Sequence, residues 1–378
     1  MGSNRLRFAR LGLAVFCFAI ASMVVLPAPT VWLWKVTLLA TEFGHWVVLL
    51  PVLLLIFRGR KSRAGRVATG FAVVSVALLL SSAVRAWWGA DRVARELAVA
   101  FPGGEIGEPF AWRELWLGRD TAPVPVETLE YARHEGAALQ LDFYHAQSTQ
   151  PAPCVVVLHT GGWDGGTRRE FEEFNHRCAR RGYAVASVEY RLAPRWHWPA
   201  QREDVRDAIR YLQSRAAALG IAPQKFVLLG RSAGGQIAEA AAYGEGDAIC
   251  GVVAFYAPAD MDFAYGYARS DDILNSLQLL RQYLGGSPAE QPAAYASASG
   301  YSLVSRRSPP TLLLHGQRDS VVWHRQSERL SARLAERGGR YFFLQPEWAT
   351  HAFDFNPHGP GGQLADYAVA RFLDAVTR

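Results

Sequence analysis

The N-terminal part of the chain contains three long runs of apolar residues that carry very little charge. The first run holds a single arginine, Arg10, and the second holds Glu42 and His45. A helix needs about 20 apolar residues to cross the hydrocarbon core of a membrane, and each run approaches that length. The pattern predicts a membrane-embedded region over residues 1–90, with transmembrane helices at residues 8–26, 37–57 and 67–84. A cleaved signal peptide is the alternative for the first run, and the two further runs argue against it.

Basic residues around these runs predict how the helices are oriented. Arginines precede the first run, and a dense cationic loop joins the second to the third (Arg58, Arg60, Lys61, Arg63 and Arg66). Cytoplasmic loops carry an excess of Lys and Arg, so we expect the N-terminus and this loop in the cytoplasm. Three spans of the cell (inner) membrane then place everything after residue 88 on the extracytoplasmic, periplasmic side. A smaller arginine group argues mildly against this orientation (Arg85, Arg92 and Arg95).

Glu42 and His45 lie three positions apart, on one face of the second predicted span. Ionisable side chains at membrane depth suggest a functional site by default. We favour a polar contact among the three helices near the outer interface, because Glu42 would lie only about one turn inside the boundary.

A juxtamembrane connector is expected at residues 91–125. After it, the apolar runs become shorter, and strand-like runs alternate with segments of helical periodicity. Strand-like runs at residues 126–134, 139–145, 154–159, 183–190, 226–229, 251–256, 311–315 and 341–345 alternate with helix-like segments. This alternation is typical of a mostly parallel sheet covered by helices on both faces. We therefore expect an α/β domain over residues 126–378, with an irregular insertion at residues 259–308 that contains one helical stretch at 273–284.

Composition excludes several other classes of function. The chain has a net charge of +6 and a sequence pI of about 9.2, but only 20% of its residues are charged. No basic stripe with interleaved aromatic residues is present, so no nucleic-acid partner is expected. The four cysteines lack metal-ligand spacing and do not form a disulfide framework (Cys17, Cys154, Cys178 and Cys250). Neither a metal nor an organic cofactor is expected.

The most informative motif follows the strand at residues 226–229. Gly230-Arg231-Ser232-Ala233-Gly234 has the pattern G-x-S-x-G, and a helix-like segment begins directly after it. A serine on such a sharp strand-to-helix turn projects above the sheet, and glycines on both sides leave room for the turn. The Ala233 N–H then lies at a helix N-terminus, where it can stabilise a developing oxyanion. Ser232 is the candidate nucleophile.

A serine nucleophile needs a base and an acid that orients the base. Asp319 follows the strand at residues 311–315, and His351 follows the next strand. The order Ser, acid, His along the chain and the positions after parallel strands both suit a catalytic triad. Asp354 is a weaker candidate for the acid, because it lies only three residues after the histidine.

The glycine loop after the strand at residues 154–159 predicts the rest of an oxyanion hole. Gly161 and Gly162 allow backbone N–H groups to turn toward a substrate oxygen without an intervening Cβ. Trp163 follows them directly. With other aromatic residues it suggests an apolar substrate pocket (Trp196, Trp198, Phe263 and Tyr265).

These motifs together resemble the carboxylesterases of the hormone-sensitive-lipase type and the related acetyl- and feruloyl-esterase-like α/β-hydrolases. The resemblance rests on the segments at residues 159–163, 190–194, 198–200, 230–235 and 315–319 and on His351. It implies an α/β-hydrolase fold, the triad Ser232, Asp319 and His351, and an oxyanion hole of Gly161, Gly162 and Ala233. The chain departs from the family pattern at Thr160, which replaces a glycine, and at Arg231, where many members carry an acid. The membrane segment lies outside the resemblance.

The sequence therefore predicts a membrane-anchored serine carboxylesterase for short- to medium-chain acyl esters, which are small molecules or lipids. An acyltransferase or a deacetylase that acts on lipid or glycan is an alternative, because sequence cannot separate acyl transfer from hydrolysis. A prolyl-oligopeptidase-like peptidase is disfavoured because nothing in the chain could form a β-propeller. A catalytically inactive, membrane-tethered binding module is disfavoured because all three triad positions are filled. The sequence leaves the oligomeric state open.

Overall fold

One eight-stranded sheet forms the centre of the C-terminal domain in the computed structural model, which describes residues 2–56, 62–104, 107–119, 121–244 and 249–378. The strand order is β1-β2-β4-β3-β5-β6-β7-β8. The pairs β1–β2 and β2–β4 are antiparallel, and every other neighbouring pair is parallel. The strands are β1 (Val126–His134), β2 (Ala137–Tyr144), β3 (Ala152–Leu158), β4 (Ala184–Val188), β5 (Ile221–Arg231), β6 (Ile249–Phe255), β7 (Thr311–Leu314) and β8 (Tyr341–Leu344). The mostly parallel sheet predicted from the strand–helix alternation is confirmed, and so is the α/β-hydrolase fold that the family resemblance implies.

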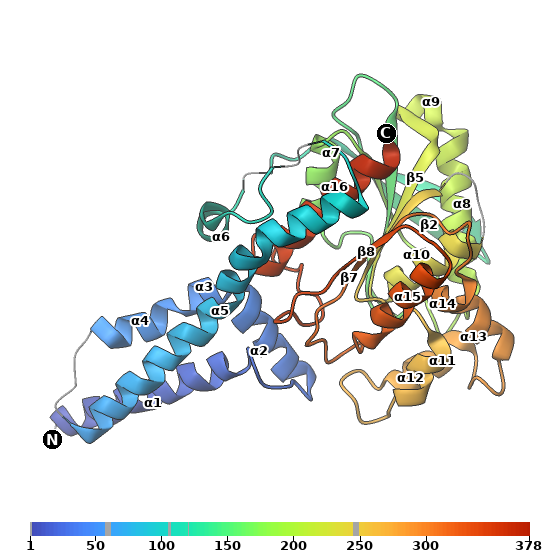
Figure 1. The fold of residues 1–378 in the computed structure, drawn as a ribbon. Coiled ribbons are helices and arrows are strands. Elements are labelled where there is room, and N and C mark those ends of the chain that lie inside the picture. Colours follow the sequence, from blue (N-terminus) through green and yellow to red (C-terminus); the bar gives the residue numbers. More distant parts are fainter. Residues whose placement is uncertain (1, 57–61, 105–106, 120, 245–248) are drawn as a thin grey trace.

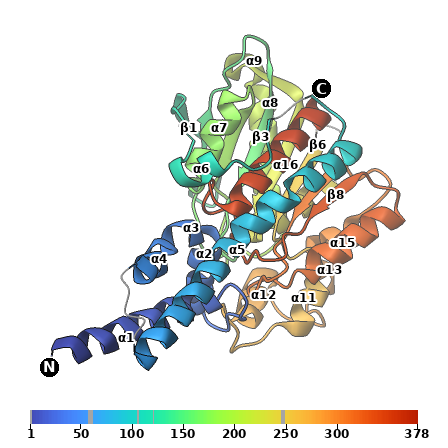
Figure 2. The same cartoon turned by 60° about the vertical axis from the view of Figure 1, so that its left-hand side comes forward.

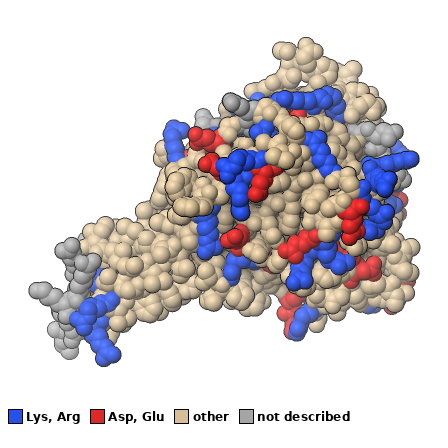
Figure 3. All heavy atoms as spheres, viewed as in Figure 1, with Lys and Arg blue, Asp and Glu red and all other residues tan. Residues whose placement is uncertain are grey.

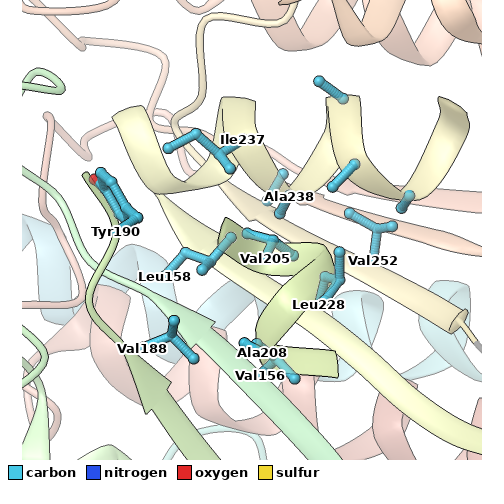
Figure 4. Packing of buried hydrophobic residues seen from close by; sticks show 14 of the residues in the cluster. Val156, Leu158, Val188, Tyr190, Val205, Ala208, Leu228, Ile237, Ala238 and Val252 are labelled. Atoms are coloured by element: carbon cyan, nitrogen blue, oxygen red, sulfur yellow. The ribbon is translucent and has the colours of Figure 1, made fainter. Parts of the chain in front are cut away.

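Helices cover both faces of the sheet, which explains why its central strands read as continuous apolar runs. On one face, Val156, Leu228 and Val252 pack against α8 (Ala200–Ser214) and α10 (Ala233–Gly244), as Figure 4 shows. On the other face, Val157 and Leu229 pack against α7 (Glu172–Arg180), α16 (Pro360–Thr377) and the second half of α5 (Arg63–Ala100). The remaining helices of this layer arrangement are α9 (Ala216–Leu219) and α15 (Arg325–Glu336).

The segment at residues 259–308 forms a group of short helices beyond the sheet. They are α11 (Met261–Tyr267), α12 (Ser276–Leu284), α13 (Pro292–Ala298) and α14 (Gly300–Leu303). The sequence predicted one helical stretch in this segment, at residues 273–284, and α12 occupies its later part. The other helices are four to seven residues long, too short for a clear helical periodicity.

The N-terminal residues form a helical arm that projects from the sheet domain. In Figures 1 and 2, α1 (Gly2–Ser22), α4 (Leu49–Ile56) and the first half of α5 run side by side along it. Within the described residues, α5 is the one continuous helix that is long and apolar enough to span a membrane. The apolar part of α1, Phe8–Ser22, is shorter than a span. The membrane character of the arm is therefore only partly supported.

The second predicted span, residues 37–57, is not a single helix. The helix α2 (Val31–Glu42) ends at Phe43, and α3 (Gly44–Val47) and α4 continue at an angle of 80° to it. A carboxylate is costly inside a membrane, and the bend instead brings Glu42 to the N-terminus of α16, where its Oε2 accepts the Gly361 N–H at 2.9 Å. The partner of Glu42 is thus the sheet domain, not another helix of the arm as expected. Phe57 and the basic residues Arg58, Arg60 and Lys61 lie outside the described residues.

The third predicted span, residues 67–84, lies within a much longer helix. α5 continues without interruption to Ala100, beyond the expected start of the connector at residue 91. Its second half packs on α16 because buried residues such as Val93 and Leu97 face the sheet domain. The ring of Phe101 completes this contact at 4.8 Å from the ring of Phe372. The short helix α6 (Trp112–Leu117) then leads to β1.

Candidate active site

Ser232 lies on the turn between β5 and α10, at the carboxyl edge of the sheet. Its φ angle is +52°, which strains a non-glycine residue by about 1–3 kcal/mol. The flanking glycines make the turn possible, because a Cβ on Gly230 would lie 2.1 Å from the Gly234 carbonyl oxygen. A Cβ on Gly234 would lie 2.4 Å from the carbonyl oxygens of residues 158 and 159. The G-x-S-x-G spacing is therefore required by backbone contact on both sides of the serine.

The structure brings the three residues of the predicted triad together from three separate loops. Ser232 Oγ lies 3.1 Å from His351 Nε2, and His351 Nδ1 lies 2.7 Å from Asp319 Oδ2. Asp319 lies in the loop after β7, and His351 lies in the loop after β8. This arrangement lets the histidine accept the serine proton through one ring nitrogen while the carboxylate fixes the other.

Asp319 is held in its ionised form by the groups around it. Burial raises the pKa of this carboxyl, but the charge of His351 and hydrogen bonds from His315 and His351 together hold it well below its usual range. The second carboxylate oxygen accepts the N–H groups of Val321 and Val322, both at 2.8 Å. His315 Nε2 lies 3.2 Å from Asp319 Oδ2. A buried, fully hydrogen-bonded carboxylate suits the orienting member of a triad.

The glycine loop after β3 reaches the same edge of the sheet. Gly161 and Gly162 have φ angles of +108° and +59°, a region that favours glycine. A Cβ on Gly161 would lie 2.3 Å from the backbone of Gly165, so no side chain fits there. Ala233 is the first residue of α10, and the first N–H groups of a helix have no partner within it. Gly162, Ser232 and Ala233 line one pocket, which suits the donors of an oxyanion hole.

Trp163 forms part of this pocket, but its position is fixed by other residues. Its indole N–H donates to Gln236 Oε1 at 2.9 Å, and its ring stacks on Tyr283 with centroids 4.4 Å apart. The free space in this pocket is small, about 50 Å³. Its other lining residues are mostly apolar (Pro258, Ala264, Tyr267, Leu274, Ser276, Leu279, Leu280, Val321 and Val322). Of the further aromatic residues expected here, none is among them.

The alternative acid, Asp354, forms its hydrogen bonds with residues other than His351. Its Oδ2 accepts from Arg231 Nε at 2.6 Å, and its Oδ1 accepts the Tyr256 hydroxyl at 2.7 Å. Arg231 is buried, with its guanidinium over the ring of Phe171 at 3.9 Å. The ion pair ties the turn that holds Ser232 to the loop that holds His351. This ion pair therefore explains structurally why an arginine can stand at position 231, where many members of the resembled family carry an acid.

Two residues near the triad were not singled out from the sequence. Tyr256 directly follows β6, and its ring centre lies 4.4 Å from that of the His351 imidazole. Its position after a parallel strand is a signal that the sequence did contain. Trp34 of α2 donates its indole N–H to the His351 carbonyl oxygen at 3.1 Å. No sequence pattern links Trp34 to a loop more than 300 residues away.

Within the described parts of the chain, no group of three or more His, Cys, Asp or Glu side chains is placed to hold a metal ion. All four cysteines are free thiols, three of them buried.

The chain is similar in sequence to several named esterases. The chain is 28% identical to the esterase LipC of Mycobacterium tuberculosis over 247 residues, which cover 61% of this chain and 60% of LipC. LipQ of the same organism gives 27% identity, and the chain spans only about three-fifths of either relative. A probable carboxylic ester hydrolase of that organism, LipM, is 26% identical across 92% of this chain and 87% of its own length.

Solved structures show the same fold at lower identity. A bacterial heroin esterase superposes with a TM-score of 0.60 at 21% identity, covering 69% of this chain and 87% of that protein. Est2 of Thermogutta terrifontis superposes with a TM-score of 0.51 at 22% identity, covering 60% and 83%. LipC and LipQ are named esterases and LipM a probable carboxylic ester hydrolase, whereas the solved structures show that the fold is shared. The model of the BD-FAE family matches residues 141–334, just over half of the sequence, and the chain belongs to that family.

Proposed function

We propose that the chain is a serine carboxylesterase in which Ser232, His351 and Asp319 form the catalytic triad. The observation that carries the proposal is the hydrogen-bonded series from Ser232 Oγ through His351 to Asp319, at 3.1 and 2.7 Å. It lies beside an apolar pocket whose wall includes Gly162 and Ala233. Membership of the BD-FAE family and similarity to named esterases support the same class of activity.

The first half of the reaction forms an acyl-enzyme. His351 Nε2 takes the proton of Ser232 while Oγ bonds to the ester carbonyl carbon. The carbonyl oxygen becomes an oxyanion, which the N–H groups of Gly161, Gly162 and Ala233 stabilise. The tetrahedral intermediate collapses as the C–O bond to the alcohol breaks, and His351 donates its proton to the departing alcohol.

The second half releases the acid. His351 removes a proton from water, and the hydroxide oxygen bonds to the acyl carbon while the oxyanion forms again in the same place. The bond to Ser232 Oγ then breaks, and Oγ recovers its proton from His351. Asp319 stays ionised throughout and stabilises the imidazolium that forms in each step.

We also propose that the arm anchors this enzyme in the cell (inner) membrane, with its N-terminus in the cytoplasm and its sheet domain on the extracytoplasmic side. The long apolar helix α5 supports an anchor. Figure 3 supports the orientation, since the arm is nearly free of charge on this face and carries Lys and Arg side chains at its tip. Exposed Arg63 and Arg66 begin α5, and positive charge marks the cytoplasmic end of a span.

Hydrolysis of a p-nitrophenyl ester series, from acetyl to palmitoyl, tests the proposal. The detergent-solubilised full chain is expected to release p-nitrophenol fastest from short- to medium-chain esters, because the pocket is small. Ser232→Ala is expected to lower kcat about a millionfold, and Ser320→Ala, a serine in the loop of Asp319, serves as the matched control. A folded wild-type chain that is inactive on every ester would overturn the esterase proposal, and an optimum at palmitoyl would overturn the assigned chain length.

A further inference from the structure

The helix α2 lies between the arm and the active site and faces both. Figure 1 shows it crossing the direction of α1 and α4 at the end of the arm nearest the sheet domain. The 80° bend at Phe43 gives it this direction. If the arm spans the bilayer, α2 therefore lies along the membrane surface rather than across the membrane.

One side of α2 has the composition of a membrane-surface helix. Trp32, Lys35 and Leu39 recur at spacings of three and four residues, so they share a face. Trp32 is 76% exposed and Leu39 is 41% exposed. The Lys35 ammonium lies 5.0 Å from the centre of the Trp32 ring. Exposed tryptophan beside lysine is typical of the headgroup region, where the indole meets the acyl boundary and the ammonium meets phosphate.

The opposite side of α2 contacts the loop that carries the catalytic histidine. Trp34 donates to the His351 carbonyl oxygen, and its ring centre lies 6.1 Å from that of the imidazole. At the end of α2, the backbone carbonyl of Glu42 accepts from Asn356 Nδ2 at 2.8 Å. The helix thus lies one side chain away from the reacting groups.

The turn before α2 contacts the loop that carries the catalytic acid. Arg318, the neighbour of Asp319, donates to the Val25 carbonyl oxygen in that turn. Val25 and Leu26 are 42% and 51% exposed. From Arg318 the same loop continues through Val321 and Val322, which line the substrate pocket, to Trp323, which is 38% exposed. Exposed apolar residues therefore extend from the arm to the rim of the pocket.

We propose that the enzyme takes its esters from the membrane surface, and that the outer face of α2, Trp32, Lys35 and Leu39, is embedded in lipid headgroups. The substrate class is an amphiphilic ester whose apolar portion stays in the bilayer while the scissile bond reaches Ser232 past α2. The occupant of this face is the bilayer, because the face is continuous with the apolar arm. This inference rests on the proposed esterase activity.

The full chain reconstituted in phosphatidylcholine vesicles tests the proposal with two substrates. Hexadecyl acetate stays in the bilayer, and p-nitrophenyl acetate is water-soluble. Trp32→Glu places a charge on the outer face of α2 without touching the triad, and α1 and α5 still hold the protein in the vesicle. We expect Trp32→Glu to hydrolyse hexadecyl acetate about tenfold more slowly than wild type, because a charged residue is disfavoured in the interface. Its rate on p-nitrophenyl acetate is expected to stay within about twofold.

Val99→Glu is the matched control. Val99 is an apolar residue near the C-terminal end of α5, and it is 84% exposed. It is expected to change neither rate. An equal loss on both substrates, or no loss on hexadecyl acetate, would overturn the inference while leaving the esterase proposal intact. A change in oligomeric state with unchanged vesicle activity would assign the face to a second copy and also overturn it. Failure of wild type on both esters would instead overturn the esterase proposal.

Discussion

Asp319 and Asp354 are two buried carboxylates that follow the last strands of the sheet, and their partners differ in kind. Asp319 is bonded to two histidines and two backbone N–H groups. Asp354 is bonded to the guanidinium of Arg231 and the hydroxyl of Tyr256. The partners of Asp319 suit a carboxylate that orients a base. Those of Asp354 suit a carboxylate that neutralises a buried cation. The two residues therefore have separable roles in rate and in stability.

Matched amide variants are expected to separate these roles. Asp319→Asn is expected to lower kcat for p-nitrophenyl acetate by about 10³–10⁴, as expected when the orienting carboxylate of a triad is lost. Asp354→Asn is expected to lower the free energy of unfolding by about 3 kcal/mol, because it leaves the Arg231 charge buried without a counter-charge. Steady-state kinetics and urea unfolding of both variants measure these effects. The reverse pattern, with kcat lost mainly in Asp354→Asn, would show that the acid is misassigned.

The sequence predicted candidate residues for acyl transfer, and the structure brings three of them into hydrogen-bond contact. Ser232, Asp319 and His351 were identifiable because each follows an apolar strand in the expected order. Gly161 and Gly162 were identifiable because a close backbone approach needs glycine. The Arg231–Asp354 ion pair could not be identified from the sequence, because a buried pair between residues 123 positions apart leaves no local pattern.

Helices α6 and α7 are joined to the segment before α16 by one histidine. His358 Nε2 lies 3.1 Å from Glu173 Oε1 of α7, and its Nδ1 lies 3.4 Å from Glu114 Oε1 of α6. Hydrogen bonds to Glu114 and Glu173 raise the pKa of His358 to about 9. This segment links the catalytic histidine loop to α16, so its charge state affects how three elements are held together.

The raised pKa predicts a loss of stability at alkaline pH. His358 binds its proton more tightly in the folded state, so its contribution is fully present below the unfolded pKa of about 6.5. That contribution declines as pH rises toward 9 and is lost above it. Thermal unfolding should show wild type losing on the order of 1 kcal/mol over this range relative to His358→Gln, after allowance for partial exposure. If the free energies of unfolding of the two proteins changed with pH in the same way, the contribution assigned to protonated His358 would be contradicted.

At the element scale, hydropathy predicted the sheet domain better than it predicted the arm. Strands β3 and β6 and residues 226–229 of β5 are apolar because helices cover both faces of the sheet. The second apolar run was wrongly predicted to be one straight span, because α2 and α4 are both apolar although they point in different directions. Only the docking of Glu42 on Gly361 shows where the direction changes, and that contact joins residues 319 positions apart.

At the scale of the whole molecule, the arm and the sheet domain are not independent units. α5 enters both cores, with Leu79 in the cluster of the arm and Val93 in that of the sheet domain. Trp34 and the Val25 carbonyl contact the loops of His351 and Asp319. A family resemblance confined to the sheet domain could not reveal these contacts. They place the proposed membrane anchor against the loops of the proposed triad rather than at a distance from them.

We propose that Ser232 is a nucleophile activated by His351. Intact-mass measurement after treatment with a fluorophosphonate, which reacts with activated serines, tests it most directly. We predict one covalent adduct per chain, located on Ser232 by peptide mapping and absent from Ser232→Ala. Labelling of His351→Ala is expected to be strongly slowed because the base that removes the serine proton is gone. An adduct at another residue, or equal labelling of wild type and Ser232→Ala, would contradict the claim.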